Sequence, residues 1–343
     1  MTSVIKTART AALTAAIAIA VSLPALAETC TTQSQMTPAD RNALAATAKD
    51  LAGKMQAGDA AGIHTASVAE VAKDFAAISD VVGNTAPKLK GDSPVVDAVY
   101  LLDASTLKPA ADGSASEGQF FCTLNRSATE ADFLIPALPP GKYAFAVVEM
   151  RGSAAPWRLS FLLRQDQGKW LMAGVYPKPT TAAGHDGLWY WTQARQMAKR
   201  NEHWNAWLYF RQAEALLVPV DFVQSSHLEK LRSEALAAAP PPLSAGIGPD
   251  TPLVVKAKDG AEYRFTSLGV DDSLNASSID IALHLRVNAI TDQAAARKQN
   301  IAAMSALLAA YPELRQPFHG IWIFADAPGQ APYATEQAMH DIP

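Results

Sequence analysis

The residues with the clearest chemical potential are Cys30 and Cys122, the two cysteines of the 343-residue sequence. A thiolate can act as a nucleophile, but neither cysteine has a histidine nearby in the sequence to activate it. In an oxidising compartment the default is a disulfide, which here would close a loop of about 90 residues. We therefore predict a Cys30–Cys122 disulfide, with a catalytic thiol as the alternative.

Three further residues could act as an acid or a base: His64, Asp103 and Glu149. None of them lies in a recognisable catalytic motif. His64 lies between two predicted helices, which is typical of a solvated histidine, whereas Glu149 interrupts an apolar segment, as residues at a strand edge or end do. Acid–base catalysis would need an acid or a histidine, and these residues are the candidates.

Metal-ligand spacings are absent from the sequence. No His-Glu-x-x-His motif and no cluster of cysteines occurs, and the histidines of the central segment are not at helical ligand spacing. These are His185, His203 and His227. Asp271, Asp272 and Asn275 resemble part of a calcium loop, but the glycine and the closing glutamate of an EF-hand are missing. His284 and His319 could meet in space, although no sequence argument says that they do. We predict no metal site and no cofactor.

The N-terminus has the three parts of a secretory signal peptide. Lys6 and Arg9 form the positive region, an apolar run follows from residue 11 to 23, and Ala25-Leu26-Ala27 supplies the small residues of a cleavage site. The apolar run is shorter than the roughly 20 residues that span a bilayer. We therefore predict cleavage after Ala27 and an exported, soluble protein, periplasmic or extracellular, without an integral membrane segment.

Charge and length set further bounds. Loss of Lys6 and Arg9 with the signal peptide would change the formal net charge from −4 to −6, which gives no support for nucleic acid as a partner. The remaining chain is longer than one hydrophobic core usually supports, so we expect several domains. We predict an α+β chain divided into a signal peptide (1–27), an α+β domain (28–180), a helical hairpin with a third helix (185–239), a Pro/Gly linker (240–250) and a small α+β domain (251–343).

The first domain is predicted to contain helices followed by strands. Thr37-Pro38 predicts a helix start, Gly58-Asp59 predicts its end, and a second helix is expected over 67–82. Five strands separated by turn signals follow, over 95–102, 119–124, 142–150, 157–164 and 169–176. The short connections favour an antiparallel meander with the helices packed on one face.

This order of elements resembles the nuclear-transport-factor-like, cone-shaped α+β fold. The resemblance depends on the two helices with the Gly58-Asp59 break and on the hairpin that ends in Gly168-Lys169-Trp170-Leu171-Met172-Ala173-Gly174. It implies a pocket between helices and sheet, which some members use for small apolar ligands and a few for isomerase or hydrolase chemistry.

Four of the seven tryptophans lie in residues 187–219. Asp186 is predicted to cap a helix that ends near Arg200. A second helix over 203–217 is apolar on two sides, with Asn205, Gln212, Arg211 and Glu214 in polar strips, so it must pack on two sides. Core packing is thus the first interpretation of the aromatic residues, and a surface for a ligand or partner is the second. The residues of that second interpretation are Trp189, Tyr190, Trp191, Trp204 and Trp207.

The spacing of Ala206, Phe210 and Ala213, followed by Pro219, resembles the second helix of a tetratricopeptide-type repeat. The preceding helix departs from that pattern, and one copy cannot form a solenoid. The resemblance therefore implies helix-pair packing and not peptide binding. Ser225-Ser226 is expected to cap a third helix that runs to about Ala238, with Ser226 and Glu229 at capping-box spacing.

The C-terminal segment follows the proline-rich linker. Asp259-Gly260 predicts a hairpin, residues 279–287 alternate as a half-buried strand, residues 292–311 form an alanine-rich helix, and residues 320–325 form a buried strand. This order, βββαβ, indicates a small sheet covered by one helix.

These features predict a non-catalytic binding or interaction protein, whose partner would be a protein or a small apolar ligand. Two alternatives stay open. One is an exported hydrolase or isomerase with its site in the N-terminal pocket, and the other is a structural component of an envelope complex.

Overall fold

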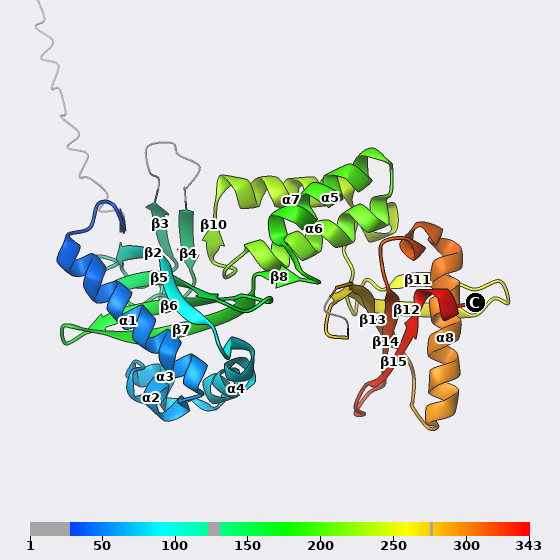
Figure 1. Ribbon diagram of the computed structural model, residues 1–343, viewed down its shortest axis with the longest axis horizontal. Helices are drawn as coiled ribbons and strands as arrows, with labels where there is room; N and C mark the ends of the chain where they lie inside the picture. The colour runs from blue at the N-terminus through cyan, green and yellow to red at the C-terminus, as the bar shows by residue number, and fades with distance from the viewer. Residues whose placement is uncertain (1–27, 123–130, 275–276) are drawn as a thin grey trace, which may run out of the picture.

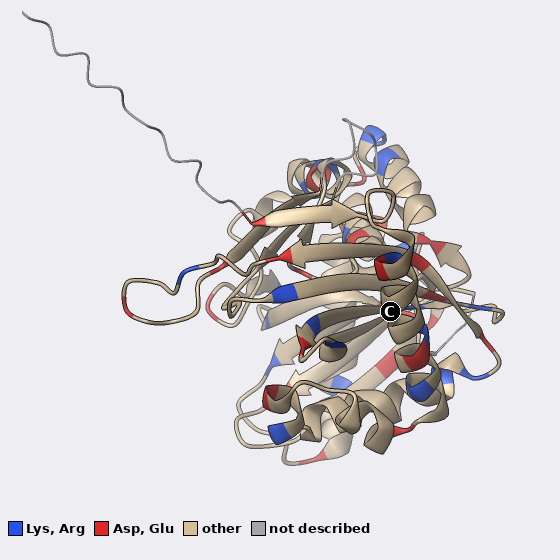
Figure 2. Cartoon of the chain, turned by 90° about the vertical axis from the view of Figure 1, so that its left-hand side faces the viewer, with Lys and Arg blue, Asp and Glu red and all other residues tan. Residues whose placement is uncertain are grey.

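The computed structural model describes residues 28–122, 131–274 and 277–343 (Figure 1). The predicted signal peptide lies outside these ranges. Helices alternate with several sheets, most of whose strand pairs are antiparallel, and this confirms the predicted α+β class. Among the described residues, no helix has the length and hydropathy that crossing a membrane requires. Figure 2 shows basic and acidic residues interspersed along the elements at the N-terminal side.

The first helix, α1 (Pro38–Ala57), begins and ends where the sequence predicts. The Thr37 hydroxyl accepts a hydrogen bond from the Asp40 backbone N–H at 3.2 Å, and Gly58 closes the helix with a left-handed φ of 68°. Leu44, Leu51 and Met55 form the buried face that packs on the sheet.

The prediction of one helix over 67–82 is wrong. After α2 (Ala60–Thr65), the structure has two short helices, α3 (Ala69–Lys73) and α4 (Ala76–Thr85). The backbone of Asp74 leaves the helical region between them, with φ −128° and ψ 70°. The break lets the apolar side chains of both helices pack on the same core.

A five-stranded antiparallel sheet forms the centre of the N-terminal part. In the order β1-β2-β5-β6-β7, its strands are β1 (Thr29–Thr32), β2 (Ser93–Asp103), β5 (Lys142–Arg151), β6 (Trp157–Asp166) and β7 (Lys169–Pro179). Its alternate residues face opposite sides. One side, which includes Ala144, Ala146 and Phe161, packs against α1 and α4, and the space between them is filled by side chains.

The opposite side of this sheet is covered by a second, smaller sheet. Its strands are β3 (Gly118–Cys122), β4 (Ala131–Ile135) and β10 (Val223–Gln224), in the order β10-β4-β3. The strand predicted over 119–124 was expected in the meander. The structure places its described part here instead, because Phe120 and Phe133 bury against Phe145 of the large sheet.

The predicted disulfide is confirmed. Cys30 of β1 and Cys122 of β3 are bonded, with their Cα atoms 5.3 Å apart. The bond ties the start of the described chain to the second sheet, and Cys122 is fully buried in the core between the two sheets.

The helical hairpin consists of α5 (Gly187–Lys199) and α6 (His203–Leu217), followed by α7 (Ser226–Ala238). Asp186 caps α5 as predicted, by accepting from the Trp189 N–H at 2.8 Å. Within the predicted Ser225-Ser226 cap, Ser225 is the capping residue of α7, since its hydroxyl accepts from the Leu228 N–H. The predicted capping box of Ser226 and Glu229 is therefore displaced by one residue. Two short strands, β8 (Thr181–Ala182) and β9 (His185–Asp186), precede the hairpin.

Helix α6 is buried on two sides, as its sequence predicts. The prediction that Asn205 lies in a polar strip is wrong, because this side chain is buried and its amide donates to the Glu313 carbonyl at 2.9 Å. A hydrogen-bond partner from a distant segment thus reverses the burial that the local pattern suggests.

Contacts at the end of α6 join the hairpin to the N-terminal sheet. Arg158 of β6 donates to the Leu216 and Leu217 carbonyls at 3.4 Å, and Lys178 of β7 donates to the Val218 carbonyl at 3.0 Å. These cations satisfy carbonyls that a helix leaves free at its C-terminus. The next segment is held by β10, which pairs with β4.

Phe222 precedes β10 and packs edge-on against two rings of the large sheet. Its ring centroid lies 5.7 Å from that of Phe145 and 5.5 Å from that of Tyr176. The segment after α6 therefore completes the core between the two N-terminal sheets.

The C-terminal part is a five-stranded sheet with one long helix, α8 (Gln293–Ala310), on one face (Figure 1). Its strands, in sheet order, are β11 (Leu253–Lys256), β12 (Glu262–Asp271), β13 (Asp280–Arg286), β14 (Gly320–Asp326) and β15 (Tyr333–Ala338). The pair β13–β14 is parallel and is connected through α8. Strand β15 was not predicted, so the order is βββαββ.

One hydrophobic core extends from α5 and α6 into the C-terminal sheet. The connection between them, over 239–252, contains a short 3₁₀ turn, η2 (Pro241–Leu243), with Leu243 buried. The hairpin and this sheet therefore support one another across the predicted linker.

Candidate functional site: a groove along helices α6 and α7

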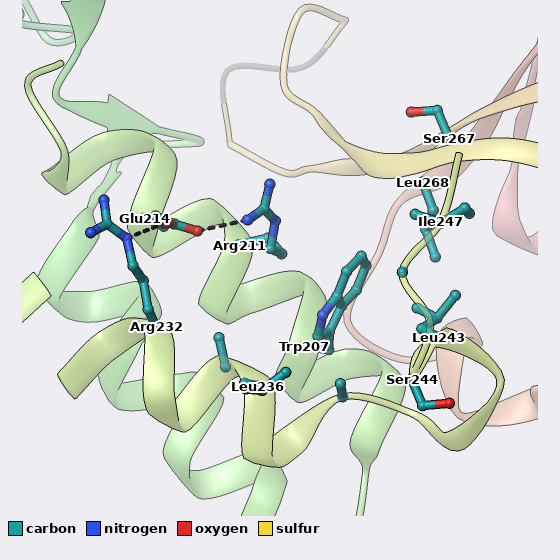
Figure 3. A pocket seen from close by; sticks show the side chains of 13 residues that line it. Trp207, Arg211, Glu214, Arg232, Leu236, Leu243, Ser244, Ile247, Ser267 and Leu268 are labelled. Carbon is teal, nitrogen blue, oxygen red and sulfur yellow. Dashed lines mark hydrogen bonds and ion pairs between the residues drawn. The ribbon is translucent and has the colours of Figure 1, made fainter. Parts of the chain in front are cut away.

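A groove of about 590 Å³ lies between α6, α7, the connection that follows α7, and β12 (Figure 3). Its apolar lining consists of Trp207, Ala235, Leu236, Ala239, Leu243, Ile247 and Leu268. The side chain of Leu236 is 76% exposed, more than any other large hydrophobic residue among those that the structure describes. The groove thus presents apolar surface that the fold itself leaves uncovered.

One end of the groove carries two guanidinium groups that share a carboxylate. Arg211 Nη1 donates to Glu214 Oε2 at 2.7 Å, and Arg232 Nε donates to Glu214 Oε1 at 2.9 Å (Figure 3). Arg232 also donates to Gln224. Two positive charges face one negative charge, and each guanidinium has five N–H donors, so donors remain for an anion.

A second hollow of about 230 Å³ adjoins these residues. It shares Arg211, Glu214 and Arg232 with the groove and adds Lys178 and Asp221. The two hollows therefore lie next to each other across the Arg–Glu–Arg triad. The groove supplies the apolar lining, and the second hollow is lined mainly by charged side chains.

Helical spacing explains why the side chains of α6 and α7 line one groove. Trp207, Arg211 and Glu214 are four and three residues apart on α6, and Arg232 and Leu236 are four apart on α7, so each set lies on one face of its helix. The packing of α7 against α6 places the two faces at the same groove. The i, i+4, i+7 pattern on α6 is a sequence signal for this surface. The sequence contains no such signal for the residues of α7 and β12 that face it.

Most of the predicted aromatic set belongs to the core. Tyr190, Trp191 and Trp204 are buried. The Tyr190 hydroxyl donates to the Ala182 carbonyl at 3.0 Å, and the Trp204 ring packs on Tyr311 at 4.0 Å between centroids. Burial raises the pKa of Tyr190, as expected for a phenol inside a core. These residues support the fold and leave little surface for a ligand.

Trp191 also lines another hollow, of about 400 Å³, together with Leu188. The Arg195 guanidinium lies over the Trp191 ring at 4.4 Å, and Glu234 accepts from both of them, at 2.7 Å from the indole N–H. The cation–π contact covers the ring face, so this arrangement is already satisfied within the chain.

Trp189 and Trp207 are the partly buried members of the predicted set. The Trp189 ring stacks on His185 at 3.7 Å between centroids. Trp207 lines the groove, and it is the one predicted residue that the structure places there.

The three catalytic candidates do not converge. Asp103 pairs across the strands with Lys142, and Glu149 forms an ion pair with Arg158 at 3.1 Å. Because residues 142 and 149 lie seven apart on β5, the backbone positions of the two acids are about 23 Å apart along the strands. His64 is exposed, and its Nε2 lies 3.1 Å from the Ala72 carbonyl.

The local surroundings of Asp103 also favour a structural role. Burial favours its protonated form, but hydrogen bonds from Ser105 and the charge of Lys142 outweigh that effect and lower the pKa of the carboxyl. An ionised carboxylate held in this way is a poor proton donor near neutral pH.

The other polar candidates form local pairs. Asp271 accepts from the Ser273 N–H at 2.9 Å in a turn, and Asn275 lies outside the described residues. His284 and His319 do not meet each other. Each pairs with its own aspartate, His284 with Asp326 at 2.7 Å and His319 with Asp280 at 3.1 Å.

Comparison of the chain with known protein families, with curated proteins and with solved structures finds no match. The resemblances to the cone-shaped fold and to the tetratricopeptide-type helix pair therefore stay predictions.

Proposed function

We propose that the chain is an exported, non-catalytic binding protein, whose groove along α6 and α7 holds a segment of a partner protein. The segment would combine an apolar side chain with a carboxylate. The observation that carries the proposal is the position of exposed Leu236, beside Trp207 and next to the Arg211–Glu214–Arg232 triad.

The chemistry of the groove supports both parts of this ligand. Covering Leu236 and the Trp207 ring would remove apolar surface from water, and full burial of a leucine stabilises a complex by about 1.5–3 kcal/mol. A carboxylate could accept from free donors of Arg211, whose side chain is 57% exposed. Arginine and tryptophan are also the residue types that dominate binding energy at interfaces.

The openness of the groove favours a protein segment over a small molecule. Sites for small molecules enclose about 70–90% of the ligand surface. Here Ser244, Gly246 and Ser267 at the rim are exposed, as is Leu236. Such a groove can hold part of a polypeptide chain whose remainder stays in solvent.

Export is supported by the sequence of the first 27 residues and by the disulfide, because disulfides persist in oxidising compartments. The two alternatives are an exported enzyme and a structural component of an envelope complex. Asp103 and Glu149 lie too far apart to act together as a catalytic pair, which disfavours the enzyme. No contact in the groove specifically favours the structural component.

A phage-displayed library of random peptides, selected on the whole exported chain, tests the proposal. Enriched peptides should place an apolar residue close to an acidic one. Their affinity, measured by isothermal titration calorimetry, should fall at least about tenfold in L236D and in R211E, which corresponds to about 1.4 kcal/mol.

The matched control is L188D, which changes an exposed leucine on α5 away from the groove. It should bind the peptides like the unmodified chain. The proposal would be contradicted if L236D bound the peptides as tightly as the unmodified chain, or if the selection enriched no sequence. Binding of a fatty acid in the groove without peptide binding would overturn the choice of a protein segment.

A further inference from the structure

Three side chains with metal-binding atoms converge at one end of the C-terminal sheet. Asp280 is the first residue of β13, His319 directly precedes β14, and Glu336 lies on β15. One potential ligand atom from each lies within 4.8 Å of those of the other two. This cluster is separate from the groove.

The backbone fixes the histidine of this cluster. The His319 N–H donates to the Ile279 carbonyl at 3.0 Å, and its carbonyl accepts from the Met339 N–H at 2.8 Å. The parallel pairing of Ile281 with Ile321 also sets β13 and β14 in register, so that Asp280 lies beside Gly320. The backbones of His319 and Asp280 are therefore held in defined positions, side by side at the ends of neighbouring strands.

Both carboxylates point to the space above Gly320. A Cβ atom on this residue would lie 3.0 Å from Glu336 Oε1 and 3.3 Å from Asp280 Oδ1. It would also lie 2.8 Å from the Gln337 carbonyl oxygen. The absence of a side chain at residue 320 thus keeps open the space on which the two carboxylates converge.

The charge of the cluster favours a cation. The Asp280 side chain is only 3% exposed, and among the described residues no lysine or arginine forms an ion pair with it. Glu336 brings a second carboxylate to the same place. Burying one carboxylate next to another is energetically costly unless positive charge compensates for it. A divalent ion supplies more positive charge than the His319 side chain alone can supply.

The ligand types and spacing suit zinc. Zinc binds histidine nitrogen and Asp or Glu oxygen at about 2.0–2.2 Å, and one imidazole nitrogen with two carboxylate oxygens leaves a fourth tetrahedral position for water. Two such ligands of a tetrahedral ion lie about 3.3 Å apart, close to the 3.1 Å between His319 Nδ1 and Asp280 Oδ1. Glu336 is partly exposed and would close the set by a side-chain rotation. Solvent can reach the site, because His319 is 37% exposed.

We propose that Asp280, His319 and Glu336 bind one divalent transition-metal ion, with water completing its coordination. No sequence motif marks this site, because the ligands are 39 and 17 residues apart in the chain. The topology of β13, β14 and β15 brings them together.

The test is a titration of the whole exported chain with Zn²⁺, after treatment with EDTA, in competition with a chromophoric chelator. We expect one equivalent to bind. Because loss of an outer-shell partner alone costs about 10–100-fold in affinity, H319A and E336Q should each lose roughly 100-fold or more. Circular dichroism would show that both variants are folded, and E336Q changes a partly exposed residue and so keeps the test valid if H319A unfolds.

The matched control is H284A. His284 and Asp326 form a similar pair on the same sheet, but no third ligand lies near them among the described residues. Zinc affinity in H284A should therefore be unchanged. Co²⁺ provides an independent readout, because it should give visible absorption bands that E336Q abolishes. Binding of less than one equivalent, or affinity in E336Q within about threefold of the unmodified chain, would show that Asp280 and His319 form only an ion pair.

Discussion

Removal of the disulfide should destabilise the N-terminal part of the protein by an amount that the structure allows us to calculate. Cys30 and Cys122 are 92 residues apart in the sequence. On the loop-entropy relation, a loop of this length is worth about 4.6 kcal/mol at 25 °C. The double variant C30A/C122A should lose about this much free energy of unfolding, because its unfolded chain regains that freedom.

The loss can be measured by hydrogen–deuterium exchange at increasing urea concentration, read separately on peptides from β5 and from β13. With a urea dependence of about 2 kcal/mol/M, the midpoint for β5 should fall by about 2.3 M. Peptides from β13 serve as an internal control, since this strand belongs to a different hydrophobic core. A loss below about 1 kcal/mol on β5, or an equal shift on β13, would refute the reasoning.

Two further predictions concern the helical hairpin. The hydrogen bonds of Arg195 outweigh the opposing effect of burial and lower the pKa of Glu234, so the stabilisation by this pair is complete above the ordinary carboxyl pKa and is lost as pH falls through the lowered value. E234Q should therefore cost about 0.5–1 kcal/mol at pH 7, a value that allows for solvent screening. Urea unfolding at several pH values should show the difference vanish in acid, and a difference independent of pH would contradict this assignment. A Cβ on Gly187 would lie 2.5 Å from Leu217 Cγ, so G187A should cost about 1–3 kcal/mol in the same assay. Its control is G83A in α4, where nothing lies within 4 Å, and which should stabilise the helix by about 0.5–1 kcal/mol. Equal effects of the two substitutions would contradict the packing argument.

Sequence patterns predicted the elements that depend on interactions between residues close together in the chain. The caps at Thr37 and Asp186 lie where the sequence places them, because a side chain that bonds to the backbone three residues on leaves a short motif. The disulfide was predictable because the chain has two cysteines. The two-sided burial of α6 followed from its helical wheel.

The missed features depend on partners that are distant in the sequence. Strand β10 has two residues, too few for an alternating pattern, and it exists because Phe133 and Asp132 of β4 pair with it. The groove takes its lining from α6, α7, the connection after α7 and β12, so only the stripe that contains Trp207 was visible in the sequence. The set of Asp280, His319 and Glu336 likewise depends on strand pairing and not on spacing.

The pairing of β10 with β4 has a consequence for how the chain can be divided. A fragment that ends at residue 180 would lack β10, so β4 would become an edge strand with unpaired backbone groups. It would also lack Phe222, and the rings of Phe145 and Tyr176 that this side chain contacts would face water. Such a fragment should self-associate when it is expressed alone. The shortest fragment that preserves the complete second sheet extends to Gln224, so a fragment of the N-terminal sheets made for expression or crystallisation should include the hairpin.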